Sequence, residues 1–162
     1  MFQNLINPTL KYNFDVVLSK YKICNNSDFT ISTTNIPIEK PLKKIDIKKY
    51  ILQSYYTGGD SIVPALWNKI YNRNFIEKNK LSFQNQKAVR ASDYWFNFEV
   101  FQLTNTSYVI PDANYCYNHI ISNSIINSYR ENQFSAFLES NRRLLEANKL
   151  LQFEIEFNKF YS

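Results

Sequence analysis

A run of lysines followed by tyrosines is the part of the chain best suited to binding an anionic ligand. The five lysines of this run are Lys40, Lys43, Lys44, Lys48 and Lys49. Asp46 is the only acid among them, and Tyr50, Tyr55 and Tyr56 follow. Ammonium groups contact phosphate oxygens and aromatic rings stack on bases, so the pattern predicts an RNA-binding surface. The alternative, which composition favours, is a solvated helix face in a lysine-rich chain.

A second, weaker basic patch is predicted in the C-terminal third. The chain has only five arginines, and three of them are Arg130, Arg142 and Arg143. A planar guanidinium group binds phosphate or carboxylate through two parallel hydrogen bonds. We therefore predict that these three residues contact RNA. An acidic protein neighbour would fit the same groups.

The aromatic residues, 17% of the chain, have two interpretations. Most of them fill the core of a protein that is poor in alanine and valine. Some can instead form a contact surface, because aromatic rings are enriched where proteins meet. Tyr55, Tyr56, Tyr94 and Trp95 are the residues that we predict at such an interface.

The sequence offers little for catalysis or for metal binding. His119 is the only histidine, so every histidine-dependent site would rest on one residue. Cys24 and Cys116 are far apart and neither has a C-x-x-C partner, which leaves too few ligands for zinc. We expect no enzyme activity, no cofactor, no metal and no small-molecule substrate. The two cysteines predict free thiols in a reducing compartment.

A glycine turn at 57–60 could present backbone N–H groups to an anion, as helix N-termini do. The turn lacks the spacing of a nucleotide-binding loop. The end of one helix followed by the start of another explains the same four residues. We expect that second interpretation.

The hydrophobic pattern predicts a single α+β domain over residues 1–162, with a small antiparallel sheet and four or five helices. Period-two alternation predicts strands over 12–18, 21–23, 29–31, 94–103 and 108–110. Helical spacing predicts helices over 47–55, 60–70 and 111–124. A long amphipathic helix is expected from Phe134 onward, and residues 149–160 are compatible with either helix or strand.

Composition suggests where the gene resides. The chain has 21 asparagines, 17 isoleucines and 14 lysines, all encoded by A/T-rich codons, but only two glycines. In this respect it resembles proteins encoded in AT-rich protist mitochondrial genomes. Such genomes mostly retain ribosomal proteins and subunits of the respiratory and ATP synthase complexes, which implies a mitochondrial matrix location. A cytoplasmic location is the alternative.

Charge and hydropathy limit the classes of partner that the chain can have. The net charge of +5 permits an anionic partner without requiring one. Residues 1–13 contain no apolar run typical of a secretory leader, and no stretch approaches the length of a membrane span. We expect a non-catalytic structural subunit of a large ribonucleoprotein, such as a mitochondrial ribosome, contacting RNA and neighbouring subunits. The alternatives are an accessory subunit of a respiratory or ATP synthase complex and a virion protein of an AT-rich phage.

Overall fold

A four-stranded mixed sheet forms the centre of the computed structural model, which describes residues 2–25, 28–57, 59–85, 91–112, 115–118 and 133–151. The strand order is β4 (Pro41–Lys43), β6 (Thr106–Ile110), β1 (Val16–Ser19) and β5 (Lys69–Tyr71). The central strands β1 and β6 are parallel, and each outer strand pairs with its neighbour in the antiparallel sense.

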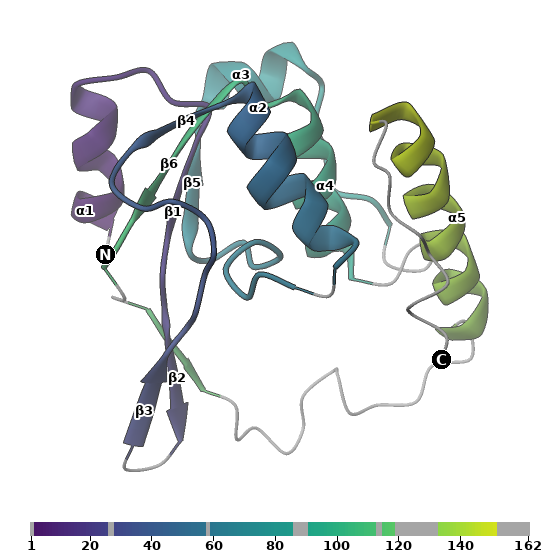
Figure 1. The fold of residues 1–162 in the computed structure, drawn as a ribbon, viewed down its shortest axis with the longest axis horizontal. Helices are drawn as coiled ribbons and strands as arrows, with labels where there is room; N and C mark the ends of the chain where they lie inside the picture. The colour runs from purple at the N-terminus through teal and green to yellow at the C-terminus, as the bar shows by residue number, and fades with distance from the viewer. Residues whose placement is uncertain are drawn as a thin grey trace.

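Helices cover both faces of this sheet (Figure 1). Val17 of β1 points to the side of α1 (Phe2–Ile6) and joins a small cluster with Leu5. Val16 and Leu18 point to the opposite side and join the main core. That core is covered by α4 (Ser92–Leu103) and by a continuous helical segment, which comprises α2 (Lys44–Asp46), the π-helix η2 (Ile47–Leu52) and the 3-10 helix η3 (Gln53–Tyr55).

A second, three-stranded sheet extends the central pair of strands. Its order is β3 (Asp28–Ile31), β2 (Lys22–Asn25) and β7 (Cys116–Asn118). The chain passes from β1 into β2 and from β6 towards β7, and both pairs are parallel. The β2–β3 hairpin therefore projects from the body, as Figure 1 shows.

Three further helices complete the described residues. The 3-10 helix η1 (Asn7–Leu10) follows α1, and α3 (Arg73–Lys78) follows β5. The last is α5 (Gln133–Leu151), which lies beside α4 (Figure 1). Trp95 connects the two, because its indole N–H donates to Ser140 Oγ at 3.2 Å.

The predicted α+β class is confirmed, and the described residues form five α-helices and two small sheets. The expected purely antiparallel sheet is wrong, because β1–β6 and β2–β7 are parallel. The strands predicted over 21–23 and 29–31, the helix predicted over 47–55 and the long helix predicted from Phe134 are confirmed, with small shifts in their ends. The strand predicted over 12–18 is confirmed only from Val16, where β1 begins. Of the undecided residues 149–160, the first three belong to α5 and the others lie outside the described residues.

The strand predicted over 94–103 is wrong, because these residues form α4. Its buried side chains include Trp95, Phe96, Phe98 and Phe101, which are distributed around the helix. A helix buried on several sides has no clear 3.6-residue hydrophobic period, so the local alternation of Phe96 and Phe98 imitated a strand.

The helix predicted over 60–70 is also wrong. Residues 60–68 form an irregular segment fixed by two buried ionisable groups. The Asp60 carboxylate accepts hydrogen bonds from the Thr34 hydroxyl at 2.7 Å and from the Asn35 backbone amide at 3.0 Å. The ammonium group of Lys69 donates to the carbonyl of Ile62 at 2.7 Å and to that of Ala65. The hydrogen bonds of these two side chains here outweigh local helix propensity.

The helix predicted over 111–124 is wrong where it can be compared. Cys116–Asn118 is strand β7, paired with β2. Residues 119–124 lie outside the described residues, and so does His119. The ring of Tyr117 in this strand stacks on Trp67 at a centroid distance of 5.5 Å.

The buried tyrosines predict a steep loss of stability in alkali. Burial raises the pKa of Tyr55, Tyr56 and Tyr71 well above the usual value, and that of Tyr94 to about 12. In the unfolded chain tyrosine ionises near pH 10. Above that pH the unfolded state binds fewer protons than the folded state, so the free energy of unfolding falls as pH rises.

Urea unfolding measured at a series of pH values checks this prediction. The tyrosine contribution is expected to be constant near neutral pH and to be lost from about pH 10 upward. The tyrosinate absorbance of these four residues should therefore appear together with unfolding. A folded protein whose buried tyrosines all ionise near pH 10 would contradict the prediction.

Candidate nucleic-acid interface

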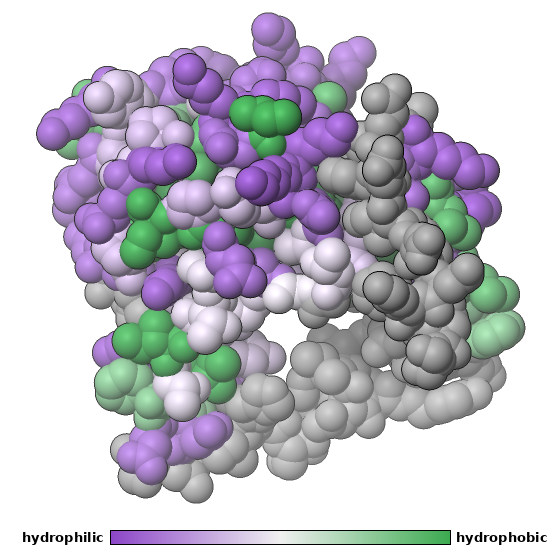
Figure 2. Space-filling model, in the orientation of Figure 1, coloured by the Kyte–Doolittle hydropathy of each residue, from purple (hydrophilic) through white to green (hydrophobic). Residues whose placement is uncertain are grey.

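The predicted lysines lie along one edge of the central sheet and on the helical segment that follows it. Lys43 ends the edge strand β4, and Lys40 directly precedes that strand. Lys48 and Lys49 lie in η2. Figure 2 shows mainly hydrophilic residues over this part of the surface, where β4 and α2 lie. The edge strand and the helix thus place the lysine run on one exposed region.

Lys44 differs from the other lysines because its ammonium group is already bound. Its Nζ donates to the carbonyl oxygen of Gln102 and to that of Thr104, the latter at 3.1 Å. Both carbonyls belong to the C-terminal end of α4, where a helix presents unpaired acceptors and partial negative charge. Burial lowers the pKa of Lys44, and the charge of Asp15 partly opposes this shift. Lys44 therefore caps α4.

Replacing Lys44 with methionine is expected to lower the free energy of unfolding by about 1 kcal/mol, because two helix carbonyls lose their cation. The matched control is Lys43→Met, on an exposed side chain next in sequence, which should change stability by less than about 0.5 kcal/mol. Urea unfolding of both variants measures the difference. Equal stabilities would show that the cap is unimportant.

Three lysines of the run remain available to a ligand. Lys40, Lys43 and Lys49 are exposed, and within the part of the chain that the structure describes they form no ion pair. The ammonium group of Lys49 lies 5.1 Å from the ring centroid of Tyr50. Lys48 is half-buried. This arrangement can supply several cations to a polyanion.

The tyrosines that were expected to stack on bases are not all available. Tyr50 is half-buried, whereas Tyr55 and Tyr56 are buried in the main core. The ring of Tyr55 packs edge-on against Phe98 at a centroid distance of 4.9 Å. Tyr50 is thus the only one of these three with a partly exposed ring.

A groove that sequence reasoning missed adjoins the lysines. It has a volume of about 580 Å³ and lies between η1 and the edge of the sheet at Pro41. Tyr12, with 58% of its surface exposed, lines it together with Lys11. Glu39 and Asp112 also line the groove, so it suits the edge and face of a base better than a phosphate. No local sequence signal connects these distant residues.

The arginines of α5 are largely neutralised by acids of the same helix. Arg142 forms ion pairs with Glu139 at 2.8 Å and with Glu146. Arg143 pairs with Glu139 at 2.7 Å, and its guanidinium carbon lies 5.8 Å from the ring centroid of Trp95. The two arginines lower the pKa of Glu139 to about 2. Arg130 lies outside the described residues.

The aromatic residues predicted at an interface lie mainly inside the chain. Tyr55, Tyr56 and Trp95 have at most 8% of their surface exposed, and Tyr94 is half-buried. They pack against one another and against Phe98. Core filling accounts for these rings, so a contact with a partner stays a prediction.

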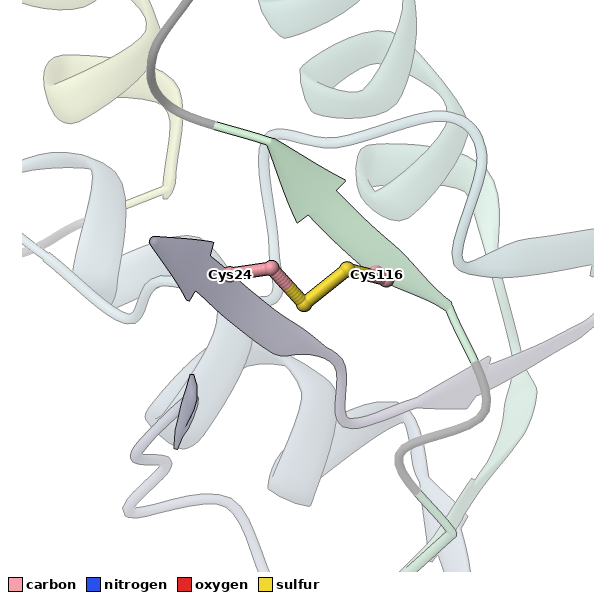
Figure 3. The surroundings of a disulfide bond; sticks show 2 residues. All are labelled: Cys24 and Cys116. Atoms are coloured by element: carbon pink, nitrogen blue, oxygen red, sulfur yellow. A yellow bond between two sulfur atoms is a disulfide. The ribbon is translucent and has the colours of Figure 1, made fainter. Parts of the chain in front are cut away.

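The prediction of free thiols is wrong. Cys24 and Cys116 form a disulfide between β2 and β7, with their Cα atoms 5.9 Å apart (Figure 3). The pairing depends on the parallel contact of two strands 92 positions apart, which sequence spacing cannot reveal. The reducing compartment inferred from free thiols therefore loses its basis.

The structure also bears on the glycine turn, on metal ligands and on membrane-spanning helices. No helix begins at Asp60, so the glycine turn does not place a helix N-terminus before an anion. Outside residues 86–90, 119–132 and the other undescribed segments, no histidine, cysteine or acid groups gather as metal ligands. In the described residues, none of the helices has the length and apolarity needed to cross a membrane.

The observed arrangement is therefore an exposed lysine region at a sheet edge, beside an aromatic groove. In comparisons with known proteins, no family model and no curated protein matches the chain.

Proposed function

We propose that the protein is a non-catalytic structural subunit of a large ribonucleoprotein, such as a mitochondrial ribosome, and that it contacts RNA. The observation that carries this proposal is the exposed set of Lys40, Lys43 and Lys49, which form no ion pair among the described residues. Cations that no described acid neutralises are available to release counterions from a phosphate backbone.

The groove beside the lysines extends the proposal from phosphates to bases. Tyr12 offers an exposed ring, and Asn4 and Asn7 offer amide groups in the same lining. Stacking on a ring tolerates any base, and amides can donate to base edges. We therefore propose that unpaired RNA follows the lysines and places a base in the groove.

Salt dependence tests the proposal. Binding of a single-stranded RNA oligonucleotide to the full chain is measured at several salt concentrations. Three phosphate contacts predict that log Kobs falls with log salt at a slope of about −2. A slope near zero would contradict RNA binding through these lysines. The alanine variant of Tyr12 should bind more weakly without changing the slope.

The exposed apolar residues of α5 favour a second candidate function, an accessory subunit held by protein contacts in a respiratory or ATP synthase complex. Phe134 is 72% exposed and Leu138 is 51% exposed. They lie on the helix face opposite Ser140 and Arg143, which contact Trp95. Under this candidate, Phe134→Gln with Leu138→Gln would release the subunit from its complex and would leave RNA binding unchanged.

A further inference from the structure

The smaller sheet has an apolar face that points away from the body. Lys22 lies opposite Ile31, and Cys24 lies opposite Phe29, so these four side chains share one face. The other face carries Ile23 and packs against the main core. Phe29 is 55% exposed and Ile31 is 51% exposed. Figure 2 shows hydrophobic residues gathered over this projecting hairpin.

The outer edge of β3 has no strand beside it in the described part of the chain. The sheet order is β3, β2, β7, so β3 is an edge strand. The Ser32 amide donates a hydrogen bond to the Tyr21 carbonyl at 2.8 Å. Ser32 and Tyr21 therefore form a hydrogen-bonded pair between the β3 side and the β2 side of the hairpin. Because such pairs alternate in an antiparallel ladder, the backbone groups of Phe29 and Ile31 point outward.

The disulfide holds this edge in a fixed position. Cys24 of β2 is linked to Cys116 of β7, so the strand that carries β3 is covalently attached to its other neighbour (Figure 3). An edge that is already ordered loses less conformational entropy when it binds another strand. The cross-linked sheet is therefore a preorganised surface.

The charge on this face identifies the kind of partner. Lys22 is its only charged residue among those described, and its ammonium group lies 4.5 Å from the ring centroid of Phe29. A carboxylate placed over the strand would meet a cation and no acid among the described residues of this face. Apolar side chains of the same partner, on either side of that carboxylate, would cover Phe29 and Ile31.

We propose that β3 binds an extended segment of a partner protein by strand addition. The segment pairs with the outward backbone groups of Phe29 and Ile31, and it carries alternating apolar residues and a carboxylate that faces Lys22. A second copy of the chain fits less well. Two chains of net charge +5 repel, and a four-residue edge buries too little area for a stable dimer. This surface is separate from the lysines proposed to contact RNA.

Amide hydrogen exchange with a synthetic peptide tests this proposal. The probe is a peptide of alternating valine and glutamate, and the control is the same peptide with lysine in place of glutamate. In the free protein, Thr30 should be protected by β2 while Phe29 and Ile31 exchange rapidly. The acidic peptide at millimolar concentration should slow exchange at Phe29 and Ile31 at least tenfold. The basic peptide should have less effect.

Variants connect the result to the proposed contacts. Lys22→Glu should reverse the preference between the two peptides, and Thr30 protection confirms in the same spectra that the hairpin remains folded. Phe29→Thr should reduce protection by both peptides. The proposal is overturned if neither peptide protects these amides, or if they are protected without peptide in a manner that depends on protein concentration. The latter result would indicate self-association.

Discussion

Replacing both Cys24 and Cys116 with serine is expected to lower the free energy of unfolding by about 4–5 kcal/mol. The disulfide joins residues 92 positions apart. A covalent loop of that length removes much of the conformational freedom of the unfolded chain, and the chain-entropy model assigns it about 4–5 kcal/mol. This is a large fraction of the total stability of a typical domain. The smaller sheet should be the first part to loosen.

Urea unfolding under oxidising and reducing conditions measures this effect. Dithiothreitol should shift the unfolding midpoint of the natural protein to that of the double serine variant. The serine variant itself should be insensitive to the reductant, which controls for other effects of dithiothreitol. If native protein instead reacts with a thiol reagent at two cysteines and reduction leaves the midpoint unchanged, the disulfide is not part of the stable fold.

Reversing the charge of Lys40, Lys43 and Lys49 together is expected to weaken RNA binding by about a hundredfold or more at low salt. Each substitution to glutamate removes a phosphate contact and adds repulsion. Loss of three contacts should also bring the salt slope from about −2 towards zero. Lys44 is left in place because it caps α4, and its replacement would mix stability with binding.

A matched variant separates local contact from net charge. Lys78, Lys80 and Lys149 are exposed and lie outside the lysine run, so their replacement by glutamate gives the same change in total charge. This control should retain the salt slope and bind RNA far better than the test variant. If both triple variants lose binding equally, attraction is a property of the net charge and the site assignment is wrong.

Segments whose local pattern agrees with their burial could be predicted from sequence. The helix from residue 133 keeps a helical period because one side packs against Trp95 and the other faces solvent. The hairpin at 22–31 is predicted by alternation and a polar turn. These elements have one buried face, and this is the condition under which periodicity is informative.

The remaining parts depend on contacts between distant residues. α4 is buried on several sides, so its sequence has no helical period. The segment at 60–68 depends on Asp60, whose carboxylate accepts a hydrogen bond from Thr34, 26 positions earlier. The sequence likewise could not distinguish Lys44 from its neighbours, because the acceptors Gln102 and Thr104 are about sixty positions away. Candidate sites on lysine runs therefore need the fold before residues can be assigned to them.

The most direct test of the proposed function is purification of the protein from its native source, with ribonuclease applied to one half and mild detergent to the other. Sedimentation then shows what remains attached. We predict that the protein sediments with a heavy particle, that ribonuclease releases it, and that detergent does not. Persistence through ribonuclease together with membrane subunits would contradict the ribonucleoprotein proposal and would favour the energy-converting complex.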